Sequence, residues 1–186
     1  MRFFRPGQGP HALEVSMAGL KMGERFLQVR CGNGKMCAAI AAKVGLSGRA
    51  CAVDEAAEGC DHGRKAATKE GVLVEVEQAS YDALPYEPDS FDVVVLWDLI
   101  GRLSPKRRVR CLQQALTVLR PGGRGMVIER VPRGALSALF GSPQVDEHYK
   151  ASGGAQRALE AEGFKAVRCL AERDGLAFVE GVKPVQ

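Results

Sequence analysis

The amino-acid sequence predicts a doubly wound α/β fold, in which helices cover both faces of a mostly parallel, seven-stranded sheet. Short apolar segments alternate along the chain with segments of helical periodicity, which is typical of parallel βαβ units. The last two predicted strands are separated by a short turn at Arg173-Asp174-Gly175. Because a parallel crossover needs about a dozen residues or more, these two strands must pair antiparallel. The sheet is therefore expected to carry one antiparallel strand near an edge.

The first half of the chain shows both periodicities. Met36, Ile40 and Val44 recur every four residues, so one face of a helix can pack on a sheet. Gly45 ends this helix. The elements predicted in this half are, in order, helix 11–20, strand 25–30, helix 35–44, strand 49–53, helix 56–70 and strand 72–76.

The second half opens with a loop and a buried strand. The unbroken apolar run 91–97 is typical of a central strand covered on both faces. Ser104-Pro105 is a good helix start, and Pro121-Gly122-Gly123 predicts the stop of that helix. The predicted elements are loop 81–90, strand 91–97, a helix from 105, strand 125–129, an irregular segment 132–150, helix 155–162, and strands 165–170 and 176–182.

Composition and length are those of one globular domain. The chain has 186 residues, of which 46% are hydrophobic and 26% charged, and its formal net charge is +4. We expect residues 1–186 to form a single domain, with a helical lead-in over 1–22. This charge does not by itself predict a nucleic-acid partner. The sequence has neither an apolar run of the about 18 residues that a membrane span needs nor a secretory signal, so we expect a cytoplasmic protein.

Two further features predict no site of their own. The six cysteines include no Cys-x-x-Cys pair, and neither a metal site nor a disulfide framework is expected. The basic run Lys106-Arg107-Arg108-Val109-Arg110 is interpreted as the solvated face of a helix, with a patch that binds RNA or an anionic ligand as the alternative.

A ligand site is predicted where the first two strands end. Gly32 and Gly34 let the backbone approach a ligand closely, and they lead into a helix N-terminus. Asp54 ends the second strand, twenty residues after Gly34, the distance at which a carboxylate can bind both hydroxyls of a ribose. Ligands of open parallel sheets bind beyond the carboxyl ends of the strands. The pattern therefore indicates a nucleoside ligand.

Two other nucleotide-binding motifs match less well. The dinucleotide fingerprint needs a third glycine, and Cys37 stands at that position. A Walker loop needs Ser or Thr after Gly34-Lys35, and Met36 follows instead. A nicotinamide-binding protein is therefore the less favoured alternative.

At these motifs the sequence resembles the class I S-adenosylmethionine-dependent methyltransferases, in particular the small-molecule group related to ubiquinone-biosynthesis enzymes. The resemblance covers roughly residues 20 to 130. Its motifs are Phe26-Leu27-Gln28-Val29-Arg30-Cys31-Gly32-Asn33-Gly34, Asp54, Ala83-Leu84-Pro85-Tyr86, Asp89-Ser90-Phe91-Asp92-Val93-Val94 and Val118-Leu119-Arg120-Pro121-Gly122-Gly123. The resemblance implies a Rossmann-like fold, S-adenosylmethionine as cofactor and methyl transfer to an unidentified small molecule.

The resemblance also implies roles for individual residues. The loop would lie under the methionine part of the cofactor, Asp54 would bind the ribose, and Trp97 with Asp98 would border the transferred methyl group. Ser80 matches the position of the adenine-binding acid. The complete set of implied cofactor-binding residues is Gln28, Arg30, Cys31, Gly32, Asn33, Gly34, Asp54, Glu55, Ser80, Tyr81 and Trp97.

Three positions depart from the family pattern. Gln28 and Ser80 stand where acids are usual, and Arg30 stands where glycine is usual. The Arg30 side chain would crowd the loop and repel a sulfonium, or it would pair with the methionine carboxylate. A weakly binding or non-catalytic relative of the family is therefore the alternative function.

Residues 132–150 follow the fifth predicted strand, where such proteins often elaborate a substrate cover. Leu136, Leu139 and Phe140 give the segment an apolar side. We interpret it as a substrate lid, with an ordinary surface connection or a dimer contact as the alternatives.

Overall fold

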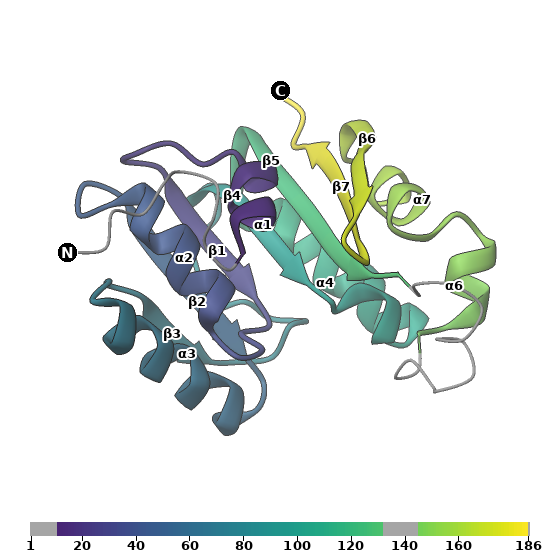
Figure 1. The fold of residues 1–186 in the computed structure, drawn as a ribbon. Coiled ribbons are helices and arrows are strands. Elements are labelled where there is room, and N and C mark those ends of the chain that lie inside the picture. Colours follow the sequence, from purple (N-terminus) through teal and green to yellow (C-terminus); the bar gives the residue numbers. More distant parts are fainter. Residues whose placement is uncertain (1–10, 132–144, 186) are drawn as a thin grey trace.

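The computed structural model describes residues 11–131 and 145–185, and these form one seven-stranded sheet with helices on both faces (Figure 1). The strand order is β3-β2-β1-β4-β5-β7-β6. The strands are β1 (Arg25–Val29), β2 (Arg49–Asp54), β3 (Glu75–Gln78), β4 (Phe91–Trp97), β5 (Leu119–Arg130), β6 (Lys165–Arg173) and β7 (Leu176–Val182). The helices are α1 (Ala12–Ala18), α2 (Lys35–Val44), α3 (Ala57–Glu70), the 3-10 turn η1 (Ile100–Arg102), α4 (Pro105–Val118), α6 (Glu147–Ala151) and α7 (Gly154–Ala161).

The strand directions confirm the predicted fold class. Strands β3, β2, β1, β4 and β5 pair in parallel. Strand β7 pairs antiparallel with β5 on one side and with β6 on the other. The single reversed strand thus lies next to the edge, as the short turn before it predicts.

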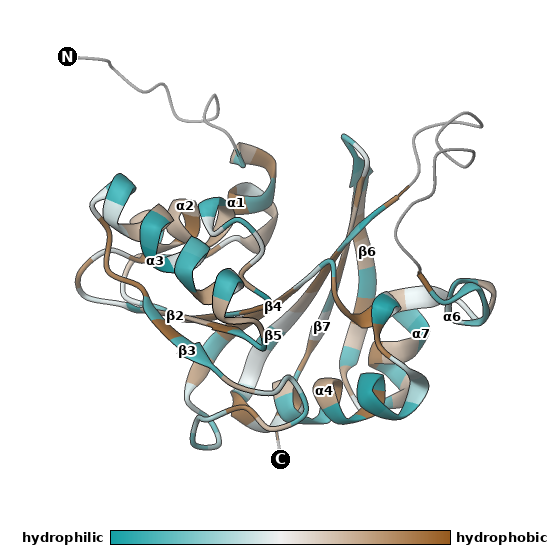
Figure 2. Ribbon diagram, turned by 90° about the horizontal axis from the view of Figure 1, so that it is seen from below, coloured by the Kyte–Doolittle hydropathy of each residue, from teal (hydrophilic) through white to brown (hydrophobic). Residues whose placement is uncertain are grey.

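Two apolar layers enclose the sheet. Helices α1, α2 and α3 lie on one face, and α4 and α7 lie on the other (Figure 2). Along β1, Phe26 packs in the layer of α2, whereas Leu27 and Val29 pack in the layer of α4. Strand β4 alternates in the same way, which explains its unbroken apolar run: both faces of a central strand are buried. Among the described helices, none combines the length and apolar character that crossing a lipid bilayer would require.

Several predictions for individual elements were wrong. Strand β3 begins at Glu75 rather than at residue 72, because the Val72 amide still donates to Ala67 O in the cap of α3. Helix α4 ends at Val118, and the segment Pro121-Gly122-Gly123 continues within β5, next to a register shift between β4 and β5. The segment predicted as irregular contains α6, whose first amides are capped by the carboxylate of Asp146. The predicted lid residues 132–144 lie outside the described residues.

Candidate functional site

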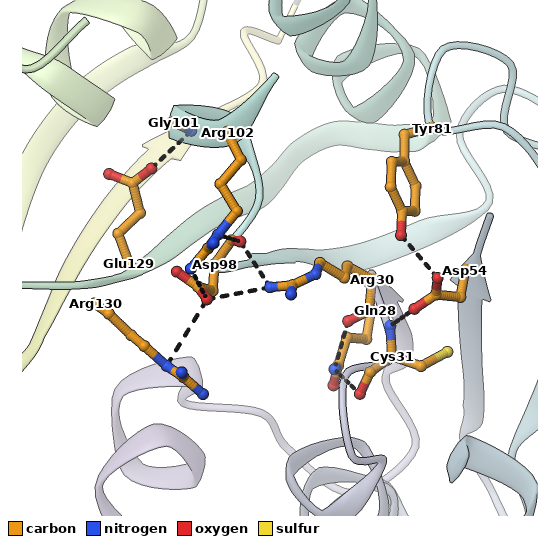
Figure 3. Close-up of polar contacts among 10 residues, drawn as sticks. All are labelled: Gln28, Arg30, Cys31, Asp54, Tyr81, Asp98, Gly101, Arg102, Glu129 and Arg130. Carbon is orange, nitrogen blue, oxygen red and sulfur yellow. Dashed lines mark hydrogen bonds and ion pairs between the residues drawn. The ribbon is translucent and has the colours of Figure 1, made fainter. Parts of the chain in front are cut away.

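The carboxyl ends of β1, β2 and β4 bring the predicted site residues together. These three strands are neighbours at the centre of the sheet, and the strand order reverses between β1 and β4. Such a switch point is where open α/β sheets bind ligands. The loop between β1 and α2, Asp54 after β2 and Asp98 after β4 all lie at this edge (Figure 3).

The β1–α2 loop contains an unusual arginine. Arg30 has a φ of 72°, in the left-handed region that favours glycine. For a residue with a side chain this conformation costs about 1–2 kcal/mol. Gly32 and Gly34 follow with φ values of 60° and 73°. The backbone of this loop therefore keeps a conformation suited to glycine at position 30, although the sequence places arginine there.

The two glycines of the loop face different neighbours. A Cβ on Gly32 would lie 3.2 Å from Nε1 of Trp97, so the indole of the β4 end packs over the loop. A Cβ on Gly34 would lie 2.6 Å from His62 O, on α3. Gly34 therefore allows α2 and α3 to pack closely. Asn33 is exposed, and its Oδ1 accepts a hydrogen bond from the Lys35 amide.

Asp54 is a buried carboxylate, 6% exposed, that ties three segments together. Its Oδ2 accepts a hydrogen bond of 2.8 Å from the Cys31 amide. Its Oδ1 accepts from the Ala56 amide at 3.0 Å and from the Tyr81 hydroxyl at 2.9 Å (Figure 3). Burial, and then the negative charge of Asp54, raise the pKa of Tyr81. The phenol therefore stays protonated and donates to the carboxylate.

Two glycines of α3 provide a direct test of how tightly Asp54 is held. A Cβ on Gly59 would collide with Cγ and Oδ2 of Asp54, whereas a Cβ on Gly63 would make ordinary contacts of 3.4 Å or more. Gly→Ala inside a helix normally stabilises it by about 1 kcal/mol. We expect Gly63→Ala to follow this rule and Gly59→Ala to destabilise by about 1 kcal/mol, since overpacking exceeds the gain in helix propensity. Urea denaturation of both variants checks this, and equal stabilisation would show that Asp54 moves freely.

Cys31 does not provide a nucleophile. Its side chain is buried, and burial, followed by the charge of Asp54, raises the pKa of its thiol to about 12. Only the thiolate is strongly nucleophilic. The contribution of Cys31 to the site is its backbone amide.

Glu55 lies in an ion-pair network that the sequence did not reveal. Its Oε1 accepts from Ser80 Oγ at 3.1 Å, from the Tyr81 amide at 3.0 Å and from the guanidinium of Arg107. Arg107 also donates to Asp82 at 3.0 Å. Burial acts to raise the pKa of Glu55, but these hydrogen bonds outweigh it and hold the pKa below its usual range. Arg107 belongs to the basic run that was interpreted as solvated, and that interpretation was wrong for this residue.

Gln28 is fully buried beneath the loop. Its Nε2 donates to Arg30 O at 3.0 Å and to Cys31 O at 3.3 Å. Its Oε1 is buried and has no hydrogen-bond partner among the described residues. A buried acceptor without a donor costs about 1–3 kcal/mol, so this oxygen is a point where a ligand donor would be stabilising.

The carboxylate of Asp98 forms ion pairs with three arginines. Its side chain is 4% exposed and its φ is 46°. Arg30 Nη1 donates to Asp98 O at 2.8 Å and lies 3.1 Å from Oδ2, and Arg102 Nη2 lies 2.7 Å from Oδ2 (Figure 3). Arg130 Nε lies at 3.7 Å. The Arg30 side chain thus spans the gap between the ends of β1 and β4, directly at the switch point.

Comparison with known proteins points to one family. A family model described as "Methyltransferase domain" matches residues 26–123. The chain is 31% identical over 121 residues to the ubiquinone/menaquinone biosynthesis C-methyltransferase UbiE of Hydrogenovibrio crunogenus, covering 64% of this chain and 46% of the relative. It is 28% identical over 117 residues to UbiE of Cronobacter sakazakii, covering 62% and 46%. The chain spans about half the length of these relatives.

Solved structures share the fold at lower identity. An S-adenosylmethionine-dependent methyltransferase from Aquifex aeolicus superposes with a TM-score of 0.76 at 20% identity, covering 93% of this chain and 89% of that one. The [4+2]-cyclase SpnF superposes with a TM-score of 0.72 at 18% identity, covering 98% and 85%. The second of these proteins is a cyclase, so the same fold also serves a reaction other than methyl transfer, and the activity has to be argued from the site.

Proposed function

The chain belongs to the methyltransferase domain family, and on that premise we propose that it transfers a methyl group from S-adenosylmethionine to a small-molecule acceptor. The observation that carries the proposal is the position of the family match. Residues 26–123 contain the β1–α2 loop, Asp54 after β2 and the end of β4. These are the parts of the sheet that meet at the switch point.

The residues present fit such a cofactor. Its ammonium group needs an acceptor, and Gln28 Oε1 is a buried acceptor without a partner among the described residues. Its ribose needs a carboxylate, and Asp54 accepts one of its three hydrogen bonds from a side-chain hydroxyl, that of Tyr81. A ribose hydroxyl is a donor of the same kind and can replace the phenol. Glu55 and Ser80 lie next to Asp54 and would border the adenine.

The proposed chemistry asks little of acids and bases. When bound, S-adenosylmethionine supplies an electrophilic methyl group on a positively charged sulfur. The protein has to hold the nucleophile in line and exclude water. Trp97 covers the loop at Gly32, and the side chain of Arg30 crosses to Asp98. These two side chains would close the site to solvent around the reacting atoms.

The test is calorimetric titration of the purified chain with S-adenosylmethionine and with S-adenosylhomocysteine. We expect both to bind with one-to-one stoichiometry, and we expect NADH, which needs the third glycine that Cys37 replaces, not to bind. Absence of heat with both sulfur nucleosides, together with unchanged thermal stability in their presence, would reject the proposal.

Arg30→Gly is expected to tighten S-adenosylhomocysteine binding several-fold. Glycine removes the guanidinium that crosses the site, which is the source of the gain in affinity. It also relieves the left-handed backbone, which costs about 1–2 kcal/mol with a side chain present and should appear as higher stability. The Asp98 carboxylate keeps Arg102 at 2.7 Å, so it remains paired. Calorimetry on the variant and the natural chain measures the effect. Equal or weaker affinity would instead support pairing of Arg30 with the methionine carboxylate.

A further inference from the structure

A cavity of about 500 Å³ opens beside Asp98, away from the β1–α2 loop. It lies at the carboxyl ends of β4 and β5 and is bounded by residues of α6, α7 and β7. Much of its wall is apolar, formed by Val131, Val145, Tyr149, Ala155, Ala177 and Val179. The cavity shares Asp98 and Arg102 with the switch point. A molecule bound there would therefore lie next to the proposed methyl donor.

Several arginines meet at the boundary between this cavity and the switch point. Three guanidinium groups, of Arg30, Arg102 and Arg130, contact the single carboxylate of Asp98 (Figure 3). The first two lie at 3.1 Å and 2.7 Å, and Arg130 lies at 3.7 Å. These three guanidinium groups thus share one carboxylate, and Arg130 has the longest of the three contacts.

Arg130 is the arginine of this group that is held most loosely. Its side chain is 64% exposed, and it makes no hydrogen bond within the described residues. A guanidinium carries five N–H donors in a planar fork that matches carboxylate and phosphate oxygens. Arg130 therefore presents an unused fork to the cavity that it lines.

Apart from Asp98, the described acids that line the cavity form no ion pair with Arg130. Glu129 precedes Arg130 in β5, and the side chains of neighbouring strand residues point to opposite faces of the sheet. Its carboxylate accepts from the Gly101 amide and from the Tyr149 hydroxyl, both at 3.0 Å. Burial raises its pKa, so it carries negative charge less readily than an exposed glutamate. Glu172 is an exposed residue of the edge strand β6, and Lys150 pairs with Glu147 at 3.1 Å.

We propose that this cavity binds the methyl acceptor and that the acceptor is an organic anion, whose carboxylate or phosphate group is held by Arg130 while its apolar part lies against Val131, Val145 and Tyr149. The inference rests on the proposed function for the identity of the occupant as methyl acceptor. The preference for an anion rests on the guanidinium of Arg130 and on the cavity that it lines.

Binding of simple probes tests the proposal. Phenyl phosphate, benzoate and the uncharged benzamide are titrated into the chain at low salt, with and without S-adenosylhomocysteine. We expect at least one of the two anions to bind and benzamide not to bind. The relative affinities of phenyl phosphate and benzoate show whether the site prefers a phosphate or a carboxylate group. Arg130→Gln should weaken the anion about tenfold or more. Arg110→Gln, which removes the same charge from an exposed site on α4 outside the cavity lining, should leave binding unchanged.

Several results would overturn the proposal. If benzamide binds as tightly as the anions, the charge of the ligand plays no role in binding. If Arg130→Gln and Arg110→Gln weaken anion binding equally, the effect comes from the net charge of the protein and not from the cavity. Loss of anion binding in Arg30→Gln but not in Arg130→Gln would place the anion on the loop side. If S-adenosylhomocysteine binds and neither anion does, the inference fails while the proposed function stands. If an anion binds through Arg130 and S-adenosylhomocysteine does not bind, the proposed function fails and the anion site stands.

Discussion

Asp54→Asn is expected to lower the free energy of unfolding by about 2–3 kcal/mol, the cost of losing charge-assisted hydrogen bonds at a buried carboxylate. Asp54 accepts from the amides of Cys31 and Ala56 and from the Tyr81 hydroxyl. An amide side chain has one acceptor oxygen, so its NH₂ group would face at least one of these donors. The β1–α2 loop and the start of α3 would then lose their common support. S-adenosylhomocysteine affinity should fall at least tenfold, because the ribose would lose its carboxylate.

Asp61→Asn is the matched control for this experiment. Asp61 lies on α3, where it is exposed and pairs with Arg64 on the surface at 3.3 Å. Removing such a pair should change the free energy of unfolding by less than about 0.5 kcal/mol. Urea denaturation compares the two variants, and calorimetry compares their affinities. A loss of stability in Asp54→Asn without a loss of affinity would show that Asp54 supports the fold alone.

The central part of the fold could be predicted because its apolar pattern is local. The run from Phe91 to Trp97 is buried on both faces and contains no polar residue other than Asp92, so β4 was predicted with its observed bounds. Strand β5 was predicted too short, because Pro121-Gly122-Gly123 looks like a helix stop. The segment is tolerated in the strand where the pairing with β4 shifts register. That irregularity depends on a neighbouring strand and leaves no local signal.

In the site, too, features set by neighbouring residues could be predicted, whereas contacts between distant segments could not. The glycine loop and Asp54 could be found because spacing after a strand is visible in the sequence. The partners of these residues could not, since Tyr81 and Arg107 reach Asp54 and Glu55 from segments 27 and 52 residues away. The unused guanidinium of Arg130 likewise became visible only when β4 and β5 were side by side. Sequence patterns thus predicted where ligands would bind, whereas the ion pairs of the site could be identified only from the folded structure.

Gly34→Ala is expected to be the most damaging of these substitutions, lowering the free energy of unfolding by about 3 kcal/mol or more. Two effects combine. The φ of 73° is strained for alanine, which costs about 1–2 kcal/mol. The added Cβ would lie 2.6 Å from His62 O and 2.8 Å from Gly63 Cα, and overpacking against backbone costs about 1–3 kcal/mol more. Because α2 would be pushed from α3, the loop that precedes α2 should lose its conformation and S-adenosylhomocysteine binding with it.

Gly71→Ala separates these two effects. Gly71 ends α3 with a φ of 65°, but a Cβ there would have no neighbour within 4 Å. It therefore suffers the backbone strain alone, about 1–2 kcal/mol, and it should leave nucleoside affinity unchanged, since it lies at the opposite end of α3 from Asp54. The difference between the two variants in urea denaturation measures the helix contact at Gly34. If both lose the same free energy, the close packing of α2 on α3 contributes nothing, and Gly34 is required only for its backbone conformation. If Gly34→Ala keeps its affinity, the loop holds its shape without that contact, and the cofactor site does not depend on the α2–α3 interface.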